Sequence, residues 1–240
     1  MAQSLPRQTL RRRIIASALV CLAGYALVGD AHAQTRPAAP KSNVPVPTPV
    51  NWALGRADAP VTVLEYGSLT CGHCAHFATD TLRTLKRTYI DTGRVKYVFR
   101  PFPTPPNDLS VAMHMLTLCA GPSRYYQLLD ALFARQGEIF AAAGGETGPK
   151  GTLFAIVEDF GGLSYAQSEA CLRDPARQNQ VVASANAGSA AGVSTTPSIF
   201  VNNVLVSDHE LLSVTSAIDR ALAARARPPT RSPAPKAKKR

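Results

Sequence analysis

Cys71 and Cys74 are separated by two residues, Gly72 and His73, in the stretch SLTCGHCAHF. Two thiols at this spacing can exchange electrons with other thiols, hold a metal ion or form an inert crosslink. A strand-like run precedes them and a helix-like run follows. A C-x-x-C pair between a strand and a helix is typical of redox chemistry. The spacing therefore predicts a thiol–disulfide redox pair.

The position of Cys71 at the start of the expected helix should make its thiol acidic. Unpaired N–H groups and the helix dipole favour a negative charge there. The pKa of the thiol then falls, and its thiolate is both populated and a good leaving group. Gly72 keeps an N–H that proline would lack, and His73 adds a donor or a positive charge. We expect both residues to tune the thiolate.

A metal site would use the same atoms, with His73 and His76 added to the two thiolates. Consecutive helical positions such as His73 and Cys74 point in different directions, and the chain has no second C-x-x-C. We therefore predict no metal and no other cofactor. A disulfide between cysteines only two residues apart restricts the unfolded chain very little and so adds little stability, which argues against an inert crosslink.

Two predicted strands and the helix between them would position this pair. The run VTVLEY at residues 61–66 is apolar and β-branched, as strands are. From Cys74 onward apolar residues recur at helical spacing until Gly93, and VKYVF at residues 95–99 indicates a second strand. Strand, helix and strand at this spacing predict a βαβ unit with parallel strands.

The rest of the chain predicts a helical block, a hairpin and a closing helix. The stretches DLSVAMHMLTLCA, YYQLLDALFARQGEIF, TLFAIVEDFG and SYAQSEACLRD combine helix formers with apolar spacing. The stretch TTPSIFVNNVLVSD predicts two strands joined by a turn at Asn202 and Asn203, residues that tolerate positive φ. ELLSVTSAIDRALAA predicts an amphipathic helix.

This order is β-α-β, a helical block and then β-β-α. It predicts an α/β thioredoxin fold with an inserted helical subdomain at about residues 105–185. The chain resembles the DsbA-like family of periplasmic disulfide oxidoreductases. The segments VTVLEYGSLTCGHCAHF, VKYVF and GVSTTPSIFVNN carry this resemblance, which covers most of residues 51–224.

Glu65 lies in an otherwise apolar strand, six positions before Cys71. A central strand of a parallel sheet is buried on both faces, and a carboxylate there is costly unless it is paired. Lys96, in the neighbouring strand, is a candidate partner. The resemblance implies that this pair lies beneath the active site and assists proton movement at the buried cysteine. The alternative is a surface ion pair at the sheet edge.

Thr196 and Pro197 precede the first strand of the hairpin. Proline is unfavourable at the start of a central strand unless it ends or bends the chain. The resemblance implies a cis proline beside the cysteine pair, which presents the Thr196 backbone to an extended substrate. The alternative is a trans proline in an ordinary turn.

Cys119 and Cys171 are the other cysteines of the predicted domain. Both fall on predicted helices, and an even number of cysteines in an exported chain indicates two pairs. Some members of the family carry such a second pair, so we expect a structural disulfide between them. Two buried free thiols are the alternative, since spacing cannot prove proximity.

The two ends of the chain differ from its middle. Residues 1–33 combine a basic start, an apolar run and an A-x-A ending, which predicts a cleaved signal peptide. Residues 34–50 form a proline-rich linker, 51–224 the thioredoxin-like domain, and 225–240 a basic tail without acids that we expect to be disordered. The predicted location is the periplasm; an uncleaved membrane anchor is the alternative.

The net charge of +10 comes from these ends. Residues 34–222 hold 15 basic and 15 acidic residues. Because no basic cluster lies on the predicted elements, we expect no nucleic-acid partner.

These features predict an exported, monomeric thiol:disulfide oxidoreductase that oxidises reduced or unfolded exported proteins. The resemblance implies a membrane reoxidase of the DsbB type. A reductase or isomerase of the same fold is one alternative. A metal- or partner-binding thioredoxin-like module, without catalysis, is another.

Overall fold

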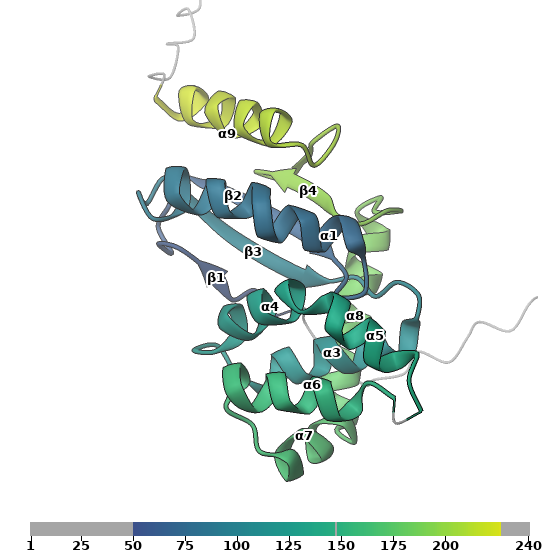
Figure 1. The fold of residues 1–240 in the computed structure, drawn as a ribbon. Coiled ribbons are helices and arrows are strands. Elements are labelled where there is room, and N and C mark those ends of the chain that lie inside the picture. The colour runs from purple at the N-terminus through teal and green to yellow at the C-terminus, as the bar shows by residue number, and fades with distance from the viewer. Residues whose placement is uncertain (1–49, 147, 227–240) are drawn as a thin grey trace, which may run out of the picture. The chain divides into compact units, whose positions relative to one another are not determined.

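The computed structural model describes residues 50–146 and 148–226. The predicted signal peptide, nearly all of the linker and most of the tail lie outside these ranges. Figure 1 shows a central sheet with helices around it. The strands are β1 (Ala53–Leu54), β2 (Val61–Gly67), β3 (Val95–Pro101), β4 (Ser198–Val201) and β5 (Val204–Leu205).

The sheet order is β1-β3-β2-β4-β5. β2 and β3 are parallel, as predicted, whereas β4 runs antiparallel to β2 and β5 antiparallel to β4. The turn between β4 and β5 has Asn202 and Asn203 at φ 47° and 68°, as the sequence predicted. β1 was not predicted, because two paired residues leave too little pattern to detect.

A single helical segment connects β2 and β3. It consists of α1 (Gly72–His76), η1 (Phe77–Thr81), α2 (Leu82–Leu85) and η2 (Lys86–Ile90), where η1 and η2 are π-helical turns. The segment begins two residues earlier than predicted. It starts beyond the carboxyl end of β2, the central strand, and this connection places Cys71 at that end of the sheet.

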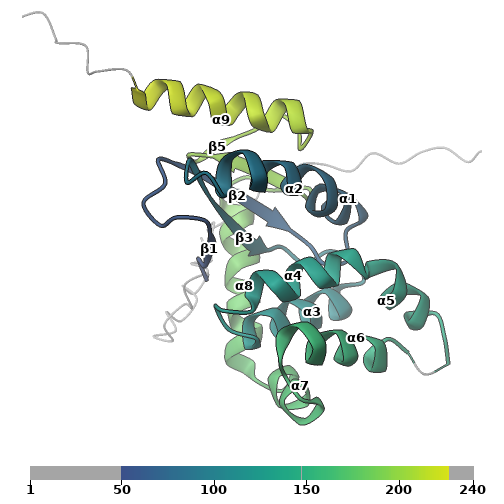
Figure 2. The same ribbon diagram turned by 60° about the vertical axis from the view of Figure 1, so that its left-hand side comes forward.

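The helical insertion follows β3. It contains α3 (Asn107–Cys119), α4 (Tyr125–Ala134), α5 (Gln136–Ala143), α6 (Lys150–Ile156), η3 (Val157–Gly161), α7 (Tyr165–Leu172) and α8 (Pro175–Ala190). The stretch predicted as one helix across α4 and α5 is interrupted at Arg135, where φ is −105° and ψ is 16°. Figure 2 shows α3 to α7 gathered at one end of the sheet, with α8 beside it.

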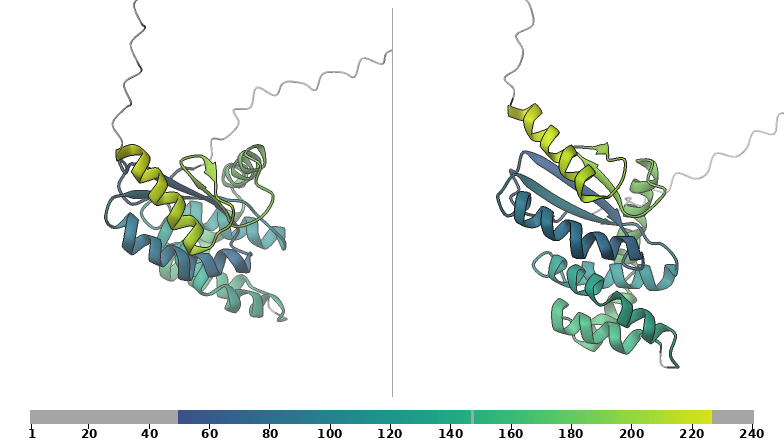
Figure 3. Two further views of the ribbon diagram at one scale, coloured as in Figure 1. Left: turned by 90° about the horizontal axis from the view of Figure 1, so that it is seen from above. Right: turned by 45° about the horizontal axis from the view of Figure 1, so that its top comes forward.

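Helices cover both faces of the sheet. Val61 and Val63 of β2 share the main apolar core with Val214 and Ile218 of α9 (Leu211–Ala226), which packs on β2 and β4 (Figure 3). On the opposite face, Tyr66 packs closely on Gly188 of α8. α9 extends two residues into the segment predicted to be disordered. The architecture is the predicted α/β thioredoxin fold with a helical insertion.

Candidate active site

Cys71 and Cys74 are both free thiols at the start of α1. Cys71 is the N-cap residue, with an extended backbone, and its side chain is half-buried. Cys74 lies in the first helical turn and is fully buried. A partner protein can therefore reach the sulfur of Cys71 and not that of Cys74.

The surroundings of Cys71 favour its thiolate. The pKa of Cys71 is lowered to about 5, chiefly by a hydrogen bond from the Cys74 thiol. The side chain of Thr196 and the backbone N–H groups of Cys74 and His73 lower it further, against the opposing effect of burial. When protonated, the Cys71 thiol donates to the Thr196 carbonyl at 3.4 Å.

The surroundings of Cys74 have the opposite effect. Burial raises the pKa of Cys74 far above its ordinary value, and Cys71 and Glu65 add to the rise. Its sulfur accepts a hydrogen bond from the backbone N–H of Ser68 at 3.4 Å. One sulfur of the pair is thus a half-buried thiolate and the other a buried thiol.

Thr196 and Pro197 lie beside the cysteine pair, as predicted. The peptide bond between them is cis. They directly precede β4, which pairs with β2, and this pairing brings the Thr196 carbonyl to Cys71 across 125 residues of sequence.

The predicted pairing of Glu65 with Lys96 is wrong. Glu65 is buried, and its Oε2 accepts a hydrogen bond from the hydroxyl of Tyr97 at 2.5 Å. Lys96 pairs in register with Thr62, and its ammonium donates to the Ala57 carbonyl at 3.3 Å. Because adjacent strand residues point to opposite faces, Lys96 faces away from the side of the sheet that carries Glu65.

The buried position of Glu65 changes its acidity. Burial raises its pKa to about 8, although the Tyr97 hydrogen bond lowers it and the nearby Cys71 adds a smaller rise. A carboxyl group with this pKa, close enough to influence Cys74, can hold or release a proton at neutral pH.

Gly72 and His73, the two residues between the cysteines, have few side-chain contacts with the Cys71 sulfur. Gly72 has open space around its Cα. The imidazole of His73 lies beside that of His209, with ring centroids 5.8 Å apart. Within the described ranges, no hydrogen bond joins this imidazole to Cys71. His73 reaches the sulfur of Cys71 through its backbone N–H instead.

Sequence reasoning missed two buried side chains that contact the active-site loop. Gln136 Nε2 donates to the carbonyls of Leu69 and Cys71, and His114 Nε2 accepts from the N–H of Leu69. Both come from the helical insertion, 45 or more residues away in sequence. No local spacing could have revealed them, because the contacts depend on how the insertion packs.

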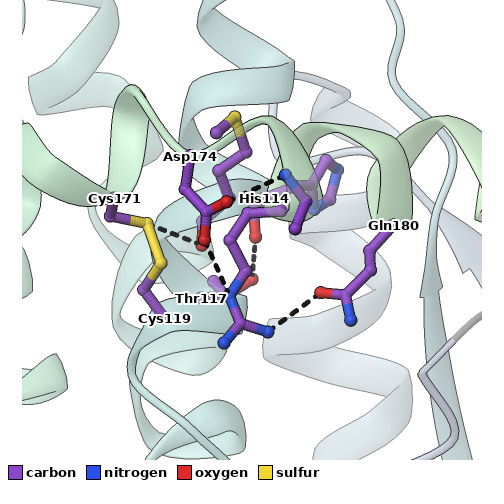
Figure 4. Close-up of a disulfide and its surroundings, with 9 residues drawn as sticks. His114, Thr117, Cys119, Cys171, Asp174 and Gln180 are labelled. Carbon is purple, nitrogen blue, oxygen red and sulfur yellow. Dashed lines mark hydrogen bonds and ion pairs between the residues drawn. A yellow bond between two sulfur atoms is a disulfide. The ribbon is translucent and has the colours of Figure 1, made fainter. Parts of the chain in front are cut away.

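Cys119 and Cys171 form a disulfide that joins α3 to α7, with their Cα atoms 6.2 Å apart. Figure 4 shows the bond near Asp174, whose carboxylate accepts from the N–H of Ala176 and caps α8. The bond lies within the insertion, apart from the cysteine pair of α1.

Two features are absent from the part of the chain that the structure describes. No three histidine, cysteine or acidic side chains gather into a group that could hold a metal ion. No helix there has both the length and the apolar character needed to cross a bilayer.

Comparison with known proteins finds relatives that are described as thioredoxins or as protein-disulfide oxidoreductases. The family model described as "Thioredoxin" matches residues 48–220. A Rickettsia bellii protein named "Putative protein-disulfide oxidoreductase" is 29% identical over 173 residues, which are 72% of this chain and 64% of the relative. The chain thus spans just under two thirds of that relative's length.

Two solved structures share the fold. Wolbachia pipientis alpha-DsbA1 superposes with a TM-score of 0.64 at 25% identity, covering 75% of this chain and 94% of that one. BdbD from Bacillus subtilis has a TM-score of 0.63 at 22% identity, and the match covers 73% of this chain and 96% of BdbD. The chain therefore belongs to the thioredoxin family, and its fold is similar to that of DsbA-like proteins.

Proposed function

We propose that this chain is an exported protein thiol:disulfide oxidoreductase that introduces disulfide bonds into secreted proteins through Cys71 and Cys74. One observation supports this most directly: the same site lowers the pKa of the half-buried Cys71 to about 5 and raises that of the buried Cys74. Stabilising the Cys71 thiolate stabilises the reduced pair, which makes the disulfide the stronger oxidant.

The reaction begins with the oxidised pair. A substrate thiolate attacks the sulfur of Cys71, the Cys71–Cys74 bond breaks, and the sulfur of Cys74 takes the electron pair. Protonated Glu65 is the proton source for this buried sulfur. A second substrate thiolate then attacks the substrate sulfur of the mixed disulfide. The Cys71 thiolate leaves, so the substrate gains a disulfide and both active-site cysteines are reduced.

Thr196 and Pro197 are the proposed substrate-binding residues. The carbonyl of Thr196 lies 3.4 Å from the Cys71 sulfur, so an extended peptide bound alongside Thr196 would bring its cysteine to Cys71. Backbone pairing of this kind does not depend on the substrate's side chains, which suits an enzyme with many substrates.

The partners and location follow from this activity. Disulfides persist in oxidising compartments, so the proposed location is the periplasm, after cleavage of the signal peptide. The proposed partners are reduced or unfolded exported proteins and a DsbB-type membrane reoxidase. The proposed state is a monomer that uses no cofactor, because electrons pass between sulfur atoms.

A reduction potential measured against glutathione tests this function. We expect a value of about −100 to −200 mV, on the oxidising side of thioredoxin. The oxidised protein should also form disulfides in a reduced, unfolded substrate, and Cys71→Ser should not. A potential near −270 mV, the approximate thioredoxin value, would show that the chain is a reductase.

Gly72 is the observation that favours the second candidate, a reductase or isomerase. The sequence CGHC also occurs in disulfide isomerases of this fold, whereas many oxidases of the family carry proline after the first cysteine. Scrambled substrate separates these roles: an isomerase recovers native pairing, and an oxidase only adds bonds. A non-catalytic metal-binding module would instead bind about one metal per chain and lose it in Cys71→Ser.

A further inference from the structure

The segment between β2 and α1 is fixed by hydrogen bonds from outside the sheet. Leu69, in the middle of this segment, is fully buried. Its carbonyl accepts from Gln136 Nε2 at 2.8 Å, and its N–H donates to His114 Nε2 at 3.4 Å. Both polar groups of the Leu69 backbone therefore have side-chain partners.

Both partners belong to the helical insertion and are themselves buried. His114 lies on α3 with no exposed surface, and Gln136 is the first residue of α5 with 8% exposed. Buried backbone groups without hydrogen-bond partners destabilise the folded state. The insertion thus supplies hydrogen bonds that the thioredoxin core does not provide for this segment.

Gln136 also reaches the redox cysteine. Its Nε2 donates to the Cys71 carbonyl at 3.2 Å, and that carbonyl also accepts from the N–H of Ala75. The positive end of the amide dipole is therefore directed at the peptide group of Cys71. It fixes the residue at the helix start, and it favours negative charge nearby.

We propose that Gln136 and His114 are positioning residues, which hold Leu69 and Cys71 so that the Cys71 thiolate stays at the N-terminus of α1. This role rests on the proposed function of the cysteine pair. It assigns the helical insertion a direct part in setting the reactivity of the pair, through two side chains.

The chemistry of His114 agrees with this role. An imidazole nitrogen that accepts from an N–H carries no proton, so the ring must be neutral. Burial lowers the pKa of His114 to about 3, and the ring therefore stays neutral at any ordinary pH. His114 Nδ1 has no partner among the described residues, so the contact with Leu69 is the one hydrogen bond of this ring there.

The first test replaces the amide donor. In Gln136→Leu the pKa of Cys71 should rise by about 0.5 unit, a threefold change in its ionisation constant. A threefold change in the equilibrium with glutathione corresponds to a potential about 14 mV more negative. The amide of Leu69 should exchange its hydrogen about tenfold faster. Ultraviolet absorbance of the thiolate, glutathione equilibrium and hydrogen exchange measure these quantities.

Gln167→Leu is the matched control. Gln167 is also a glutamine of the insertion whose side chain bonds a backbone group, since its Oε1 accepts from the N–H of Ser164 at 2.8 Å. It caps α7 and has no contact with the active-site segment. Its replacement should lower thermal stability and leave the pKa of Cys71 and the potential unchanged.

His114 provides the second test. His114→Leu removes the acceptor for the Leu69 N–H and should also speed exchange at Leu69, whereas His114→Gln offers an amide oxygen and should restore slow exchange. The proposal fails if Gln136→Leu and His114→Leu lower the melting temperature while the pKa of Cys71 and the potential match the wild type. A wild-type potential near that of thioredoxin would instead overturn the oxidase function. The two failures can be told apart, because the pKa and hydrogen-exchange measurements need no substrate and test the positioning role by themselves.

Discussion

Tyr97 donates its hydroxyl hydrogen to Glu65 across 2.5 Å, and both side chains are buried between β2, β3 and the helices on that face. The bond satisfies Oε2, while Oε1 has no partner among the described residues. One hydrogen bond is not enough to offset the burial of a charge, and the pKa of Glu65 is raised to about 8. The acid therefore binds a proton far above its ordinary range.

The first prediction concerns stability and pH. Because the folded pKa of Glu65 is raised above its ordinary value of 4.5, its contribution to stability is fully present below pH 4.5 and is lost as the pH rises through about 8. In oxidised protein, where Cys71 does not titrate, Glu65 should lower the free energy of unfolding over this range. The fall should be measured above pH 6.5, because below that value the buried neutral ring of His114 has the opposite effect. The slope from this group approaches about 1.4 kcal/mol per pH unit.

Glu65→Gln should abolish this fall, because the amide stays neutral at every pH. Lys96→Gln is the control and should leave it intact, since Lys96 lies on the other face of the sheet. Denaturant unfolding at several pH values measures both. An equal fall in wild type and Glu65→Gln would show that another group is responsible.

The second prediction separates the two active-site cysteines. Cys71→Ser should abolish thiol oxidation, because the half-buried sulfur that substrates attack is gone. Cys74→Ser should accumulate mixed disulfides, because the buried sulfur that resolves them is missing. Non-reducing electrophoresis with a thiol substrate distinguishes the variants. Trapped complexes of equal yield in both would contradict this division of roles.

The third prediction concerns the acidity of Cys71. In the reduced protein its alkylation rate should rise with pH around a midpoint of about 5. Cys74→Ala should move the midpoint upward, because the hydrogen bond from Cys74 is the largest cause of the lowered pKa. Cys74→Ser keeps a hydroxyl donor and should move it less. A midpoint that stays the same in the alanine variant would assign the lowered pKa to Thr196 and the helix start instead of to Cys74.

The fourth prediction concerns the disulfide of the insertion. Its sequence separation of 52 residues corresponds to roughly 4 kcal/mol of chain entropy. The double change Cys119→Ala and Cys171→Ala should therefore lower the melting temperature by about 10 °C. Oxidation of a thiol substrate in vitro should stay near the wild-type rate, because this bond lies apart from Cys71. A large loss of activity at a temperature where the variant is folded would contradict a purely structural role.

The sequence was sufficient to predict those features that depend on local pattern. The apolar runs identified β2, β3 and the helix after Cys71, and the Asn202–Asn203 pair identified a hairpin. Glu65 was recognisable because a charged residue interrupts an apolar strand. Its partner was not, because neighbouring positions such as Lys96 and Tyr97 face opposite sides of the sheet, and only the register of β3 shows which side.

The contacts of Gln136 and His114 depend on a different level of structure. Neither residue is unusual in its local sequence, and each meets Leu69 only after α3 and α5 have packed beside the sheet. The break at Arg135, which places Gln136 at the start of a new helix, is marked only by Gly137, and a single glycine within a helical pattern is a weak signal. Such positions can be found only from the packed fold.

The lowered pKa of Cys71 also makes the free energy of unfolding depend on the redox state of the cysteine pair. Reduced protein carries a thiol whose pKa is about 5 when folded and 9.0 in its ordinary state. Between these values the unfolded chain binds more protons at this thiol, so Cys71 adds to the free energy of unfolding of the reduced form as the pH rises and opposes the loss that Glu65 causes. The oxidised form has no such group at this position. From about pH 5 to 9.0, the stability of the reduced form therefore increases relative to that of the oxidised form. Each catalytic cycle thus moves the molecule between two states with different free energies of unfolding.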